Sequence, residues 1–499
     1  MPTIPAVLRA AAAAAPDREA VVTPDRRLTF AALLEEVRRF SAAAVAAGLT
    51  HGDRVAIWAP NTIDWVVASL GLTGIGVVLV PVNTRFKGEE ARYLLDTTSA
   101  TALVVDDEFV GGLLGQDPVD ALENPSLQVI RTSSLEGFLA GGASVSADVV
   151  EKLAGSVVDD DASDIIFTSG TTGKPKGVVA THGQSVGIFQ TWADTVGFRE
   201  GERMLVVAPF FHTFGYKAGM LACLLKRSTM VPLKVFDVDD ALRTINAEAI
   251  DVVPGPPTLY SSLLEHPGLA AASLKLRLAV TGAAVVPEAL IKRMRTELGF
   301  EEVITAYGLT ECTGLATACR PGDPDEVISL TSGRAVEGVS VTVLAPVGEP
   351  GEVLVRGYGV TRGYWEDPEA TAEAIDADGW LHTGDVGVMD EAGNLRITDR
   401  IKDMYVVGGF NAYPAEIEQV LVQHPGVSEA AVIGVPDERM GEVGKAFVVP
   451  RAGAVLAPDE LIAWCREKLA NYKVPRYVSV VDALPKNATG KVTKNVLRA

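Results

Sequence analysis

The stretch Thr168-Ser-Gly-Thr-Thr-Gly-Lys-Pro-Lys-Gly177 combines three kinds of phosphate-binding group. Its glycines let backbone N–H groups converge on anionic oxygens, and its hydroxyl side chains add further donors. Lys174 and Lys176 supply positive charge. The composition predicts a loop that holds the phosphates of a nucleotide. The alternative is a surface turn rich in glycine and threonine.

The sequence around this loop differs from a Walker A motif. That motif needs Ser or Thr directly after Gly-Lys and a helix that begins there, whereas Pro175 follows Lys174. The apolar runs Asp164–Phe167 and Val178–His182 predict a strand on each side, with a helix only from about Gln184. The loop is therefore expected to join two strands. It indicates a nucleotide without fixing a reaction.

The composition favours a globular protein of at least two domains. The chain has 499 residues, 48% hydrophobic and 22% charged residues, and a net charge of −20. So acidic a chain is not expected to use nucleic acid or an anionic membrane as its main partner. No run of about 18 residues lacks charges and helix breakers, so no integral membrane association is expected.

The N-terminus and the cysteines predict a cytoplasmic protein. The alanine tract 10–15 follows no basic segment and ends at Pro16, which predicts an amphipathic first helix and no signal peptide. The cysteines form no CxxC pair and are expected to be reduced thiols: they are Cys223, Cys312, Cys319 and Cys465. Cys312 is either a reactive nucleophile or a small buried hydrophobe, and burial is the preferred interpretation.

The first part of the chain alternates short β-branched runs with helix-length segments, which predicts parallel βαβ units. The predicted strands are Val55–Trp58, Val77–Val82 and Ala102–Val105, and the predicted helices are Trp65–Leu72 and Glu89–Leu95.

Four later strands end in turns with special side chains, namely Phe210–Gly219, Pro254–Tyr260, Thr281–Ala284 and Tyr307–Glu311. Aromatic rings beside glycines form a slot, and small residues let a flat group approach the backbone. Because the carboxyl ends of parallel strands meet at one sheet edge, one site is predicted there. His212 in the first turn is either a core residue or a gate that orients the substrate.

The pattern changes twice towards the C-terminus. Val339–Leu344 and Gly351–Arg356 alternate at period two, which predicts antiparallel strands of a smaller β region. The segment 379–385 is expected to be a turn that ends in Asp385. Residues 401–499 predict a compact α+β module. Lys491 lies on a glycine-containing loop near its end and is, on pattern alone, a solvated lysine.

Six motifs in this order and spacing resemble those of the adenylate-forming superfamily of acyl-CoA synthetases, luciferases and peptide-synthetase adenylation domains. They are the phosphate loop, Gly282-Ala-Ala284, Tyr307–Glu311, Thr383-Gly-Asp385, Arg400–Asp403 with Gly408-Gly409, and Pro485–Lys491. The resemblance covers essentially the whole chain. It implies an α/β fold with a large N-terminal domain of βαβ subdomains plus a small β region (1–400) and a mobile α+β C-terminal domain (401–499).

The resemblance also implies a two-step reaction with ATP, Mg²⁺ and coenzyme A. A carboxylate attacks the α-phosphate of ATP and pyrophosphate leaves, and a thiol then attacks the acyl adenylate. No protein nucleophile is needed, so catalysis depends on positioning and charge neutralisation. The chain ends shortly after Lys491 without a carrier-protein domain, so free CoA is the expected acceptor. A homodimer is a candidate assembly.

Residue roles follow from the same resemblance. The residues expected to hold phosphates are Thr168, Ser169, Gly170, Thr171, Thr172 and Lys176. Those expected around adenine and ribose are Gly282, Ala283, Ala284, Tyr307, Gly308, Asp385 and Arg400. The catalytic set comprises Lys491, Thr310, His212 and Glu311, which also helps to hold Mg²⁺. Lys402 is the expected hinge, and Gly408 and Gly409 are expected to face the pantetheine channel.

The expected walls of the acid pocket are mostly small or apolar, which suits a bulky apolar acid with a keto or hydroxyl group. The predicted lining residues are Phe211, Thr213, Gly215, Tyr216, Pro257, Thr281, Thr313 and Gly314. These segments are similar to those of actinobacterial ligases for the bicyclic propanoate fragment of steroid rings, and of relatives in terpenoid antibiotic pathways. Lys217 is either a substrate contact or a surface lysine that passes an aromatic ring.

Several alternatives to a complete ligase for such an acid stay open. One is an enzyme for a single half-reaction, either adenylation or thioesterification. Others are a CoA ligase for medium-chain or aryl acids, a luciferase-like oxidase and a non-catalytic binding protein. The retained motifs disfavour the last of these.

Overall fold

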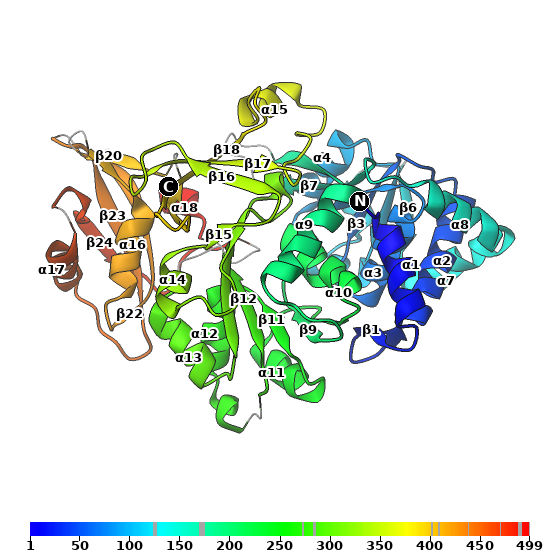
Figure 1. The fold of residues 1–499 in the computed structure, drawn as a ribbon, viewed down its shortest axis with the longest axis horizontal. Helices are drawn as coiled ribbons and strands as arrows, with labels where there is room; N and C mark the ends of the chain where they lie inside the picture. The colour runs from blue at the N-terminus through cyan, green and yellow to red at the C-terminus, as the bar shows by residue number, and fades with distance from the viewer. Residues whose placement is uncertain are drawn as a thin grey trace.

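Two largely parallel sheets form the fold as far as Ala335 (Figure 1). The computed structural model describes residues 1–122, 127–168, 175–271, 274–282, 286–400, 403–407, 410–437, 439–469, 471–487 and 492–498. The strands of the first sheet are β3 (Arg54–Trp58), β4 (Val78–Pro81), β5 (Ala102–Val105), β6 (Gln128–Arg131), β7 (Ala162–Thr168) and β8 (Lys176–Thr181). Their order is β6-β5-β3-β4-β7-β8, and only β7 and β8 pair antiparallel. The prediction that strands flank the phosphate loop is confirmed.

The second sheet has parallel strands at its centre and antiparallel strands at its edges. Its strands are β1 (Glu19–Val22), β2 (Arg27–Thr29), β9 (Arg203–Val206), β10 (Thr229–Pro232), β11 (Val252–Pro254), β12 (Leu278–Gly282), β13 (Glu302–Tyr307), β14 (Thr317–Ala318) and β15 (Arg334–Ala335). Their order is β15-β14-β13-β12-β11-β9-β10-β1-β2. The run from β13 to β1 is parallel, so the turns after these strands share one edge.

Helices cover the sheets and fill the space between them (Figure 1). In chain order they are α1 (Ile4–Ala14), α2 (Phe30–Ala46), α3 (Ile63–Thr73), α4 (Gly88–Thr97), α5 (Asp107–Leu114), α6 (Pro118–Leu122), α7 (Leu135–Gly141), α8 (Ala147–Ser156), α9 (His182–Thr195), α10 (Ala222–Leu225), α11 (Val238–Ala247), α12 (Pro257–Glu265), α13 (Glu288–Thr296) and α14 (Asp325–Leu330). In α3 every residue except Asp64 is buried, which explains its nearly uniform apolar sequence.

Helix α3 also connects the two sheets. It packs beside β3 and β4, and its Trp65 ring lies 4.9 Å from the Phe210 ring and 5.5 Å from the Tyr216 ring, measured between centroids. Phe210 and Tyr216 belong to the segment after β9. The segment predicted to bind the acid is therefore supported from behind by a rigid aromatic cluster.

The smaller β region is a four-stranded antiparallel sheet. Its strands are β16 (Val339–Val343), β17 (Gly351–Gly357), β18 (Leu381–Met389) and β19 (Leu395–Arg400), with α15 (Pro368–Ala374) between β17 and β18. The prediction that Asp385 ends a turn is wrong. Asp385 lies within β18, directly opposite Arg400 of β19.

The residues after Arg400 form a separate mixed sheet with its own helices. Its elements are β20 (Tyr405–Val407), β21 (Phe410–Ala412), α16 (Pro414–Val422), β22 (Val427–Asp437), β23 (Gly441–Pro450), α17 (Pro458–Lys468), β24 (Tyr477–Val480) and α18 (Lys494–Arg498). Ile417, Leu421 and Val432 belong to a core that is distinct from the larger one. In Figure 1 these elements lie at the opposite end of the molecule from α1 and α2.

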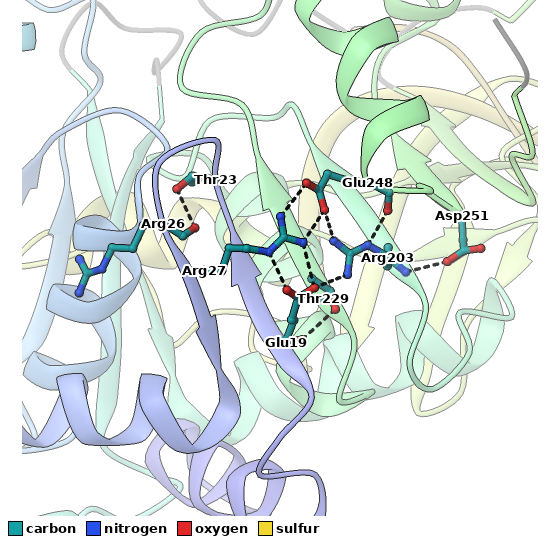
Figure 2. Close-up of polar contacts among 8 residues, drawn as sticks. All are labelled: Glu19, Thr23, Arg26, Arg27, Arg203, Thr229, Glu248 and Asp251. Atoms are coloured by element: carbon teal, nitrogen blue, oxygen red, sulfur yellow. Dashed lines mark hydrogen bonds and ion pairs between the residues drawn. The ribbon is translucent and has the colours of Figure 1, made fainter.

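A network of ion pairs ties β1 and β2 to the centre of the second sheet, at the amino ends of its parallel strands (Figure 2). The Arg203 guanidinium lies 2.7 Å from the Glu19 carboxylate and 2.5 Å from the Glu248 carboxylate. Arg27 contacts the same two carboxylates at 2.7 and 2.8 Å. The hydrogen bond from Arg27 is the main cause that lowers the pKa of Glu19 from its usual 4.5 to about 2.

Replacing Arg203 with methionine is expected to lower the free energy of unfolding by about 1–2 kcal/mol, because two neighbouring carboxylates lose a shared cation in a partly exposed setting. Arg27 and then Arg203 lower the pKa of Glu19 in the fold, so the part of the stabilisation that Arg203 supplies through Glu19 is complete above the unfolded pKa near 4.5. It is lost as the pH falls towards about 2. Thermal unfolding of both proteins at pH 7, 5 and 4 measures this: the difference should shrink only below about pH 5.

Arg243→Met is the matched control for this prediction. Its partner Asp240 lies one turn away on α11, and both side chains are at least half exposed. Such a pair contributes little to stability. Equal losses in the two variants would contradict a stabilising role for the network.

Candidate active site

The carboxyl end of β13 meets β18 of the antiparallel sheet. The Tyr307 hydroxyl donates a hydrogen bond of 2.7 Å to the Asp385 carboxylate. Thr383 fixes the local strand, because its hydroxyl donates to the Val353 carbonyl at 2.7 Å and accepts from the Asp385 backbone N–H at 3.1 Å. Burial, followed by the Asp385 charge, raises the pKa of Tyr307 far above its usual range. Tyr307 therefore stays a hydrogen-bond donor towards the carboxylate.

Glu311 lies beside the end of β7, where the phosphate loop begins. Its carboxylate oxygen Oε1 accepts hydrogen bonds from the Tyr364 hydroxyl at 3.1 Å and the Thr168 hydroxyl at 3.5 Å. The Glu311 carbonyl accepts from the Thr361 backbone N–H at 2.8 Å, which fixes the short turn Thr310–Cys312. The Lys176 ammonium lies 5.1 Å from the centroid of the Tyr364 ring. Groups that are predicted to bind phosphate and one carboxylate thus share a small space.

Tyr364 contacts the predicted site residue Glu311 and is a candidate site residue that the sequence did not indicate. It lies between β17 and α15 in a stretch that carries none of the recognised motifs. Its only local signal is an aromatic pair, Tyr364-Trp365, directly after Gly363. Burial and the Glu311 charge raise the pKa of Tyr364 well above its usual range, so its hydroxyl remains a donor to that carboxylate.

The segment after β9 belongs to the predicted wall of the acid pocket and contacts the turn Thr310–Cys312. The Thr213 hydroxyl donates to the Thr310 hydroxyl at 3.4 Å. The Phe214 backbone N–H donates to His212 Nδ1 at 3.2 Å, which orients the imidazole. Gly215 is required here, because a Cβ at this position would lie 2.1 Å from the Pro209 carbonyl oxygen. The chain then continues into a π-helix, Phe214–Leu221.

Backbone crowding explains two other glycines of the predicted site. A Cβ on Gly282 would lie 2.5 Å from the Ala306 carbonyl oxygen, and one on Gly308 would lie 2.3 Å from the Gly314 carbonyl oxygen. The strand ends of β12 and β13 therefore approach their neighbours more closely than any side chain allows.

Of the remaining predicted wall residues, Thr281, Thr313 and Pro257 are buried and Phe211 is partly buried. The Thr313 hydroxyl donates to the Gly359 carbonyl at 2.7 Å. The Thr281 hydroxyl is buried and has no hydrogen-bond partner among the described residues. Such a group is a donor available to a ligand.

Tyr216 and Lys217 lie deeper than the sequence suggested. Tyr216 is fully buried in the aromatic cluster around Trp65. The interpretation of Lys217 as a surface lysine is wrong: its side chain is 1% exposed and its ammonium lies 3.0 Å from the Asp164 carboxylate. Lys217 is paired with a protein carboxylate on β7.

The cysteines give no sign of a nucleophile. All four are free and buried. Burial raises the pKa of Cys312 to about 12, so its thiol stays protonated at neutral pH. The preferred interpretation of Cys312 as a buried hydrophobe is confirmed. Among the described residues, no group of three or more His, Cys, Asp or Glu side chains is placed to hold a metal ion.

Part of the predicted site falls outside the described residues, as does the side chain of Arg400. The residues concerned are Ser169, Gly170, Thr171, Thr172, Ala283, Ala284, Lys402, Gly408, Gly409 and Lys491.

Residues 8–365 match the family described as AMP-binding enzyme, and residues 416–491 match the AMP-binding enzyme C-terminal domain. The chain belongs to the AMP-binding enzyme family. One relative is a 3-[(3aS,4S,7aS)-7a-methyl-1,5-dioxo-octahydro-1H-inden-4-yl]propanoyl:CoA ligase from Rhodococcus jostii (strain RHA1). It is 49% identical over an alignment of 514 residues, gaps included, that covers 99% of this chain and 98% of the relative. The predicted class, an AMP-forming acid–CoA ligase of the adenylate-forming superfamily, is confirmed.

Solved structures of other CoA ligases share the fold of this AMP-binding enzyme. The anthranilate CoA ligase AuaEII in complex with anthranoyl-AMP superimposes with a TM-score of 0.88 at 28% identity, over 100% of this chain and 96% of that one. The o-succinylbenzoate CoA synthetase MenE from Bacillus subtilis, with ATP and a magnesium ion, gives 0.83 at 29% identity over 99% of each chain. The predicted fold class is confirmed, with a large N-terminal domain and a small C-terminal one.

Within the part of this AMP-binding enzyme that the structure describes, no helix has both the length and the apolar character needed to cross a bilayer.

Proposed function

We propose that this AMP-binding enzyme is an acyl-CoA ligase that activates a bicyclic, steroid-derived propanoate as its acyl adenylate and transfers it to CoA. The observation that carries the proposal is the Glu311 carboxylate beside Thr168, with the acid-side residue Thr213 in contact with Thr310. This arrangement brings the start of the phosphate loop and the predicted acid wall together. The 49% identical relative, matched along its whole length, supports the choice of acid.

In the proposed first step, Tyr307, Asp385 and Arg400 hold the adenosine. The Asp385 carboxylate, which accepts a hydrogen bond from Tyr307, is an acceptor of the kind that suits the hydroxyl groups of a ribose. Arg400 lies directly opposite Asp385 in the backbone register of β18 and β19, which supports the proposal that Arg400 binds the ribose. Gly282 and Gly308 allow close backbone packing that fixes the ends of β12 and β13, and the flat base is proposed to bind beside these ends. Fixed groups of this kind lower the barrier by positioning.

The residues around Glu311 fit a magnesium ion that arrives with ATP. Mg²⁺ is usually bound by one or two carboxylates together with substrate phosphates and waters. Glu311 supplies one carboxylate, and the Thr168 hydroxyl lies at 3.5 Å from it. Once bound, the ion would neutralise charge on the phosphate oxygens. Thr168, Thr310 and Lys176 would donate to the remaining oxygens.

The proposed acid pocket lies between the segment after β9 and the ends of β12 and β13. Its predicted lining is small or apolar and suits a compact ring system: Phe211, Thr213, Gly215, Pro257, Thr313 and Gly314. The unpartnered Thr281 hydroxyl is a suitable donor for a keto oxygen on that ring system. His212, held by the Phe214 N–H, would orient the carboxylate end.

The proposed second step requires movement of the C-terminal domain, taken as residues 401–499. Lys491 would approach the α-phosphate in the first step, and Gly408 with Gly409 would line the thiol channel in the second. Lys402 is the proposed hinge. The contact from the Ala415 N–H to the Asp399 carboxylate, at 2.9 Å, joins α16 to β19 next to this hinge. A domain that alternates between two orientations is a common way to divide two chemical steps.

We also propose a cytoplasmic location, because all four cysteines are free and buried, as is usual in reducing compartments. A homodimer remains the proposed assembly.

The function is tested by pyrophosphate release with ATP, Mg²⁺ and a panel of bicyclic, polycyclic, aryl and straight-chain acids, with CoA thioesters followed by mass spectrometry. Acid-dependent pyrophosphate release and a thioester, fastest with a bicyclic dioxo propanoate, are expected. Preference for a straight-chain or aryl acid would contradict the proposed substrate. If no acid of the panel gives pyrophosphate release but synthetic adenylates give the thioester, the enzyme catalyses the second step only.

A further inference from the structure

A fully buried ion pair joins two segments of the proposed site. Lys217, in the π-helix Phe214–Leu221, lies with its ammonium 3.0 Å from the Asp164 carboxylate of β7, and each side chain is 1% exposed. Removing two charges from water is unfavourable unless geometry and further hydrogen bonds compensate. A pair of hydrophobic residues would fill the same space at less cost. Stability alone therefore does not explain the pair.

The carboxylate is held from its other side as well. The Ser163 hydroxyl donates to Asp164 Oδ2 at 2.7 Å and lies 3.2 Å from the Ser185 hydroxyl of α9. Burial lowers the pKa of Lys217 below its usual value, and the adjacent Asp164 charge offsets only part of this effect. The ion pair is thus part of a chain of polar contacts that fixes Asp164 relative to both α9 and the π-helix.

Both partners lie on irregular backbone. The pairing of β7 with β8 shifts register between Ala162 and Asp164, so Ser163 is the extra residue of a β-bulge. A bulge re-aims the side chains of a strand, and π-helical turns occur often at functional sites. Two such irregularities meet at one pair of charges. A regular strand and a regular α-helix would present these side chains differently.

The two segments lead to the two halves of the proposed site. Asp164 lies on β7 just before Thr168, where the phosphate loop begins. Lys217 lies just after Thr213, which contacts Thr310. The ion pair therefore connects the strand that leads to the phosphate loop with the segment that forms the predicted acid wall.

We propose that Lys217 and Asp164 are positioning residues whose ion pair sets the register between the acid-side π-helix and the strand that carries the phosphate loop. This inference rests on the proposed function in naming adenylation as the step it serves. The β- and γ-phosphates are present only in that step. Disturbing the register should therefore slow adenylation, and it should leave the reaction of a preformed adenylate with CoA largely intact.

The test compares three variants with the wild-type enzyme. Lys217→Met leaves an unpaired buried carboxylate, and the double variant Asp164→Leu/Lys217→Met removes both charges, which restores stability if packing is adequate. Arg277→Met is the matched control. It breaks the ion pair of Arg277 with Glu202, also about nine-tenths buried, at the amino ends of β12 and β9. The readouts are the thermal midpoint, pyrophosphate release, KM for ATP, ATP affinity by calorimetry, and thioester formation from a supplied adenylate.

A misplacement of about 1 Å can lower a rate by about 100-fold, so adenylation is expected to fall by about 10- to 100-fold in both Lys217 variants, with a higher KM for ATP. Thioester formation from supplied adenylate should stay within about 3-fold of wild type, since this step does not use the phosphate loop. The double variant should recover the thermal midpoint without recovering adenylation. Arg277→Met should lose stability with no change in the ratio of the two steps.

Recovery of both stability and adenylation in the double variant would overturn the proposal, as would a parallel loss of both steps. If Lys217→Met does not fold, the double variant alone decides. A wild-type enzyme that releases no pyrophosphate with any acid would contradict the proposed function. In that case ATP affinity tests the ion pair: weaker ATP binding in the double variant than in Arg277→Met supports the inference, and equal binding overturns it.

Discussion

Replacing Lys491 with alanine is expected to lower the rate of acyl-adenylate formation by about 100- to 1000-fold, the usual loss for one preorganised donor at a developing charge. In the proposed mechanism its ammonium reaches the carboxylate and the α-phosphate only in the first orientation of the C-terminal domain. In the same proposed mechanism, thioester formation from a supplied adenylate uses the other orientation. It should therefore stay close to the wild-type rate. Single-turnover assays of the two steps measure this separation.

Lys494→Ala is the matched control for the loss of a nearby positive charge. Its ammonium lies 2.9 Å from the Glu418 carboxylate, so it already has a partner on α16. Both steps should continue at close to wild-type rates in this variant. If Lys491→Ala slows both steps equally, the proposal that the two steps use different orientations of the C-terminal domain is wrong.

Replacing Glu311 with glutamine is expected to lower adenylation by about 100-fold or more, because an amide keeps the shape of the side chain but removes a charge at the phosphates. The variant should need a higher Mg²⁺ concentration for half-maximal rate, since a neutral amide is a weaker ligand for Mg²⁺ than a carboxylate. Pyrophosphate release measured against Mg²⁺ concentration tests both expectations.

Tyr364→Phe separates the charge of Glu311 from its orientation. This variant removes the hydroxyl that donates to Glu311 Oε1 at 3.1 Å and keeps the carboxylate. A loss of about 10-fold is expected, at the lower end of the range of about 1.5–3 kcal/mol for a hydrogen bond to a charged group, because this bond is long at 3.1 Å. An unchanged Mg²⁺ dependence in Glu311→Gln, or a larger defect in Tyr364→Phe, would contradict the assignment of Glu311.

Local patterns predicted many elements of the fold correctly. The predicted strand Ala102–Val105 has the bounds of β5, and the runs on both sides of the phosphate loop are the strands β7 and β8. Asp385 was misplaced because Thr383-Gly-Asp385 has the composition of a turn. The strand instead continues through this stretch, with Gly384 at a φ of +67°. A glycine in the left-handed region allows an irregular strand as well as a turn.

Contacts between distant segments explain what the sequence could not predict. Lys217 and Asp164 meet only after β7 and the π-helix have packed together, and the same holds for Tyr364 and Glu311. Neither pair has a characteristic spacing. The network of Glu19, Arg27, Arg203 and Glu248 likewise joins residues that are ordinary surface charges in the sequence.

The burial of all four native cysteines makes this chain a favourable background for thiol-selective labelling. Thiol reagents react with exposed thiolates, and burial raises the pKa of Cys312 to about 12 and that of Cys465 to about 11. A single cysteine placed on the exposed surface of α17 would therefore carry a fluorophore without competing sites. Its emission could follow rotation of the C-terminal domain during turnover, with the native thiols left unmodified.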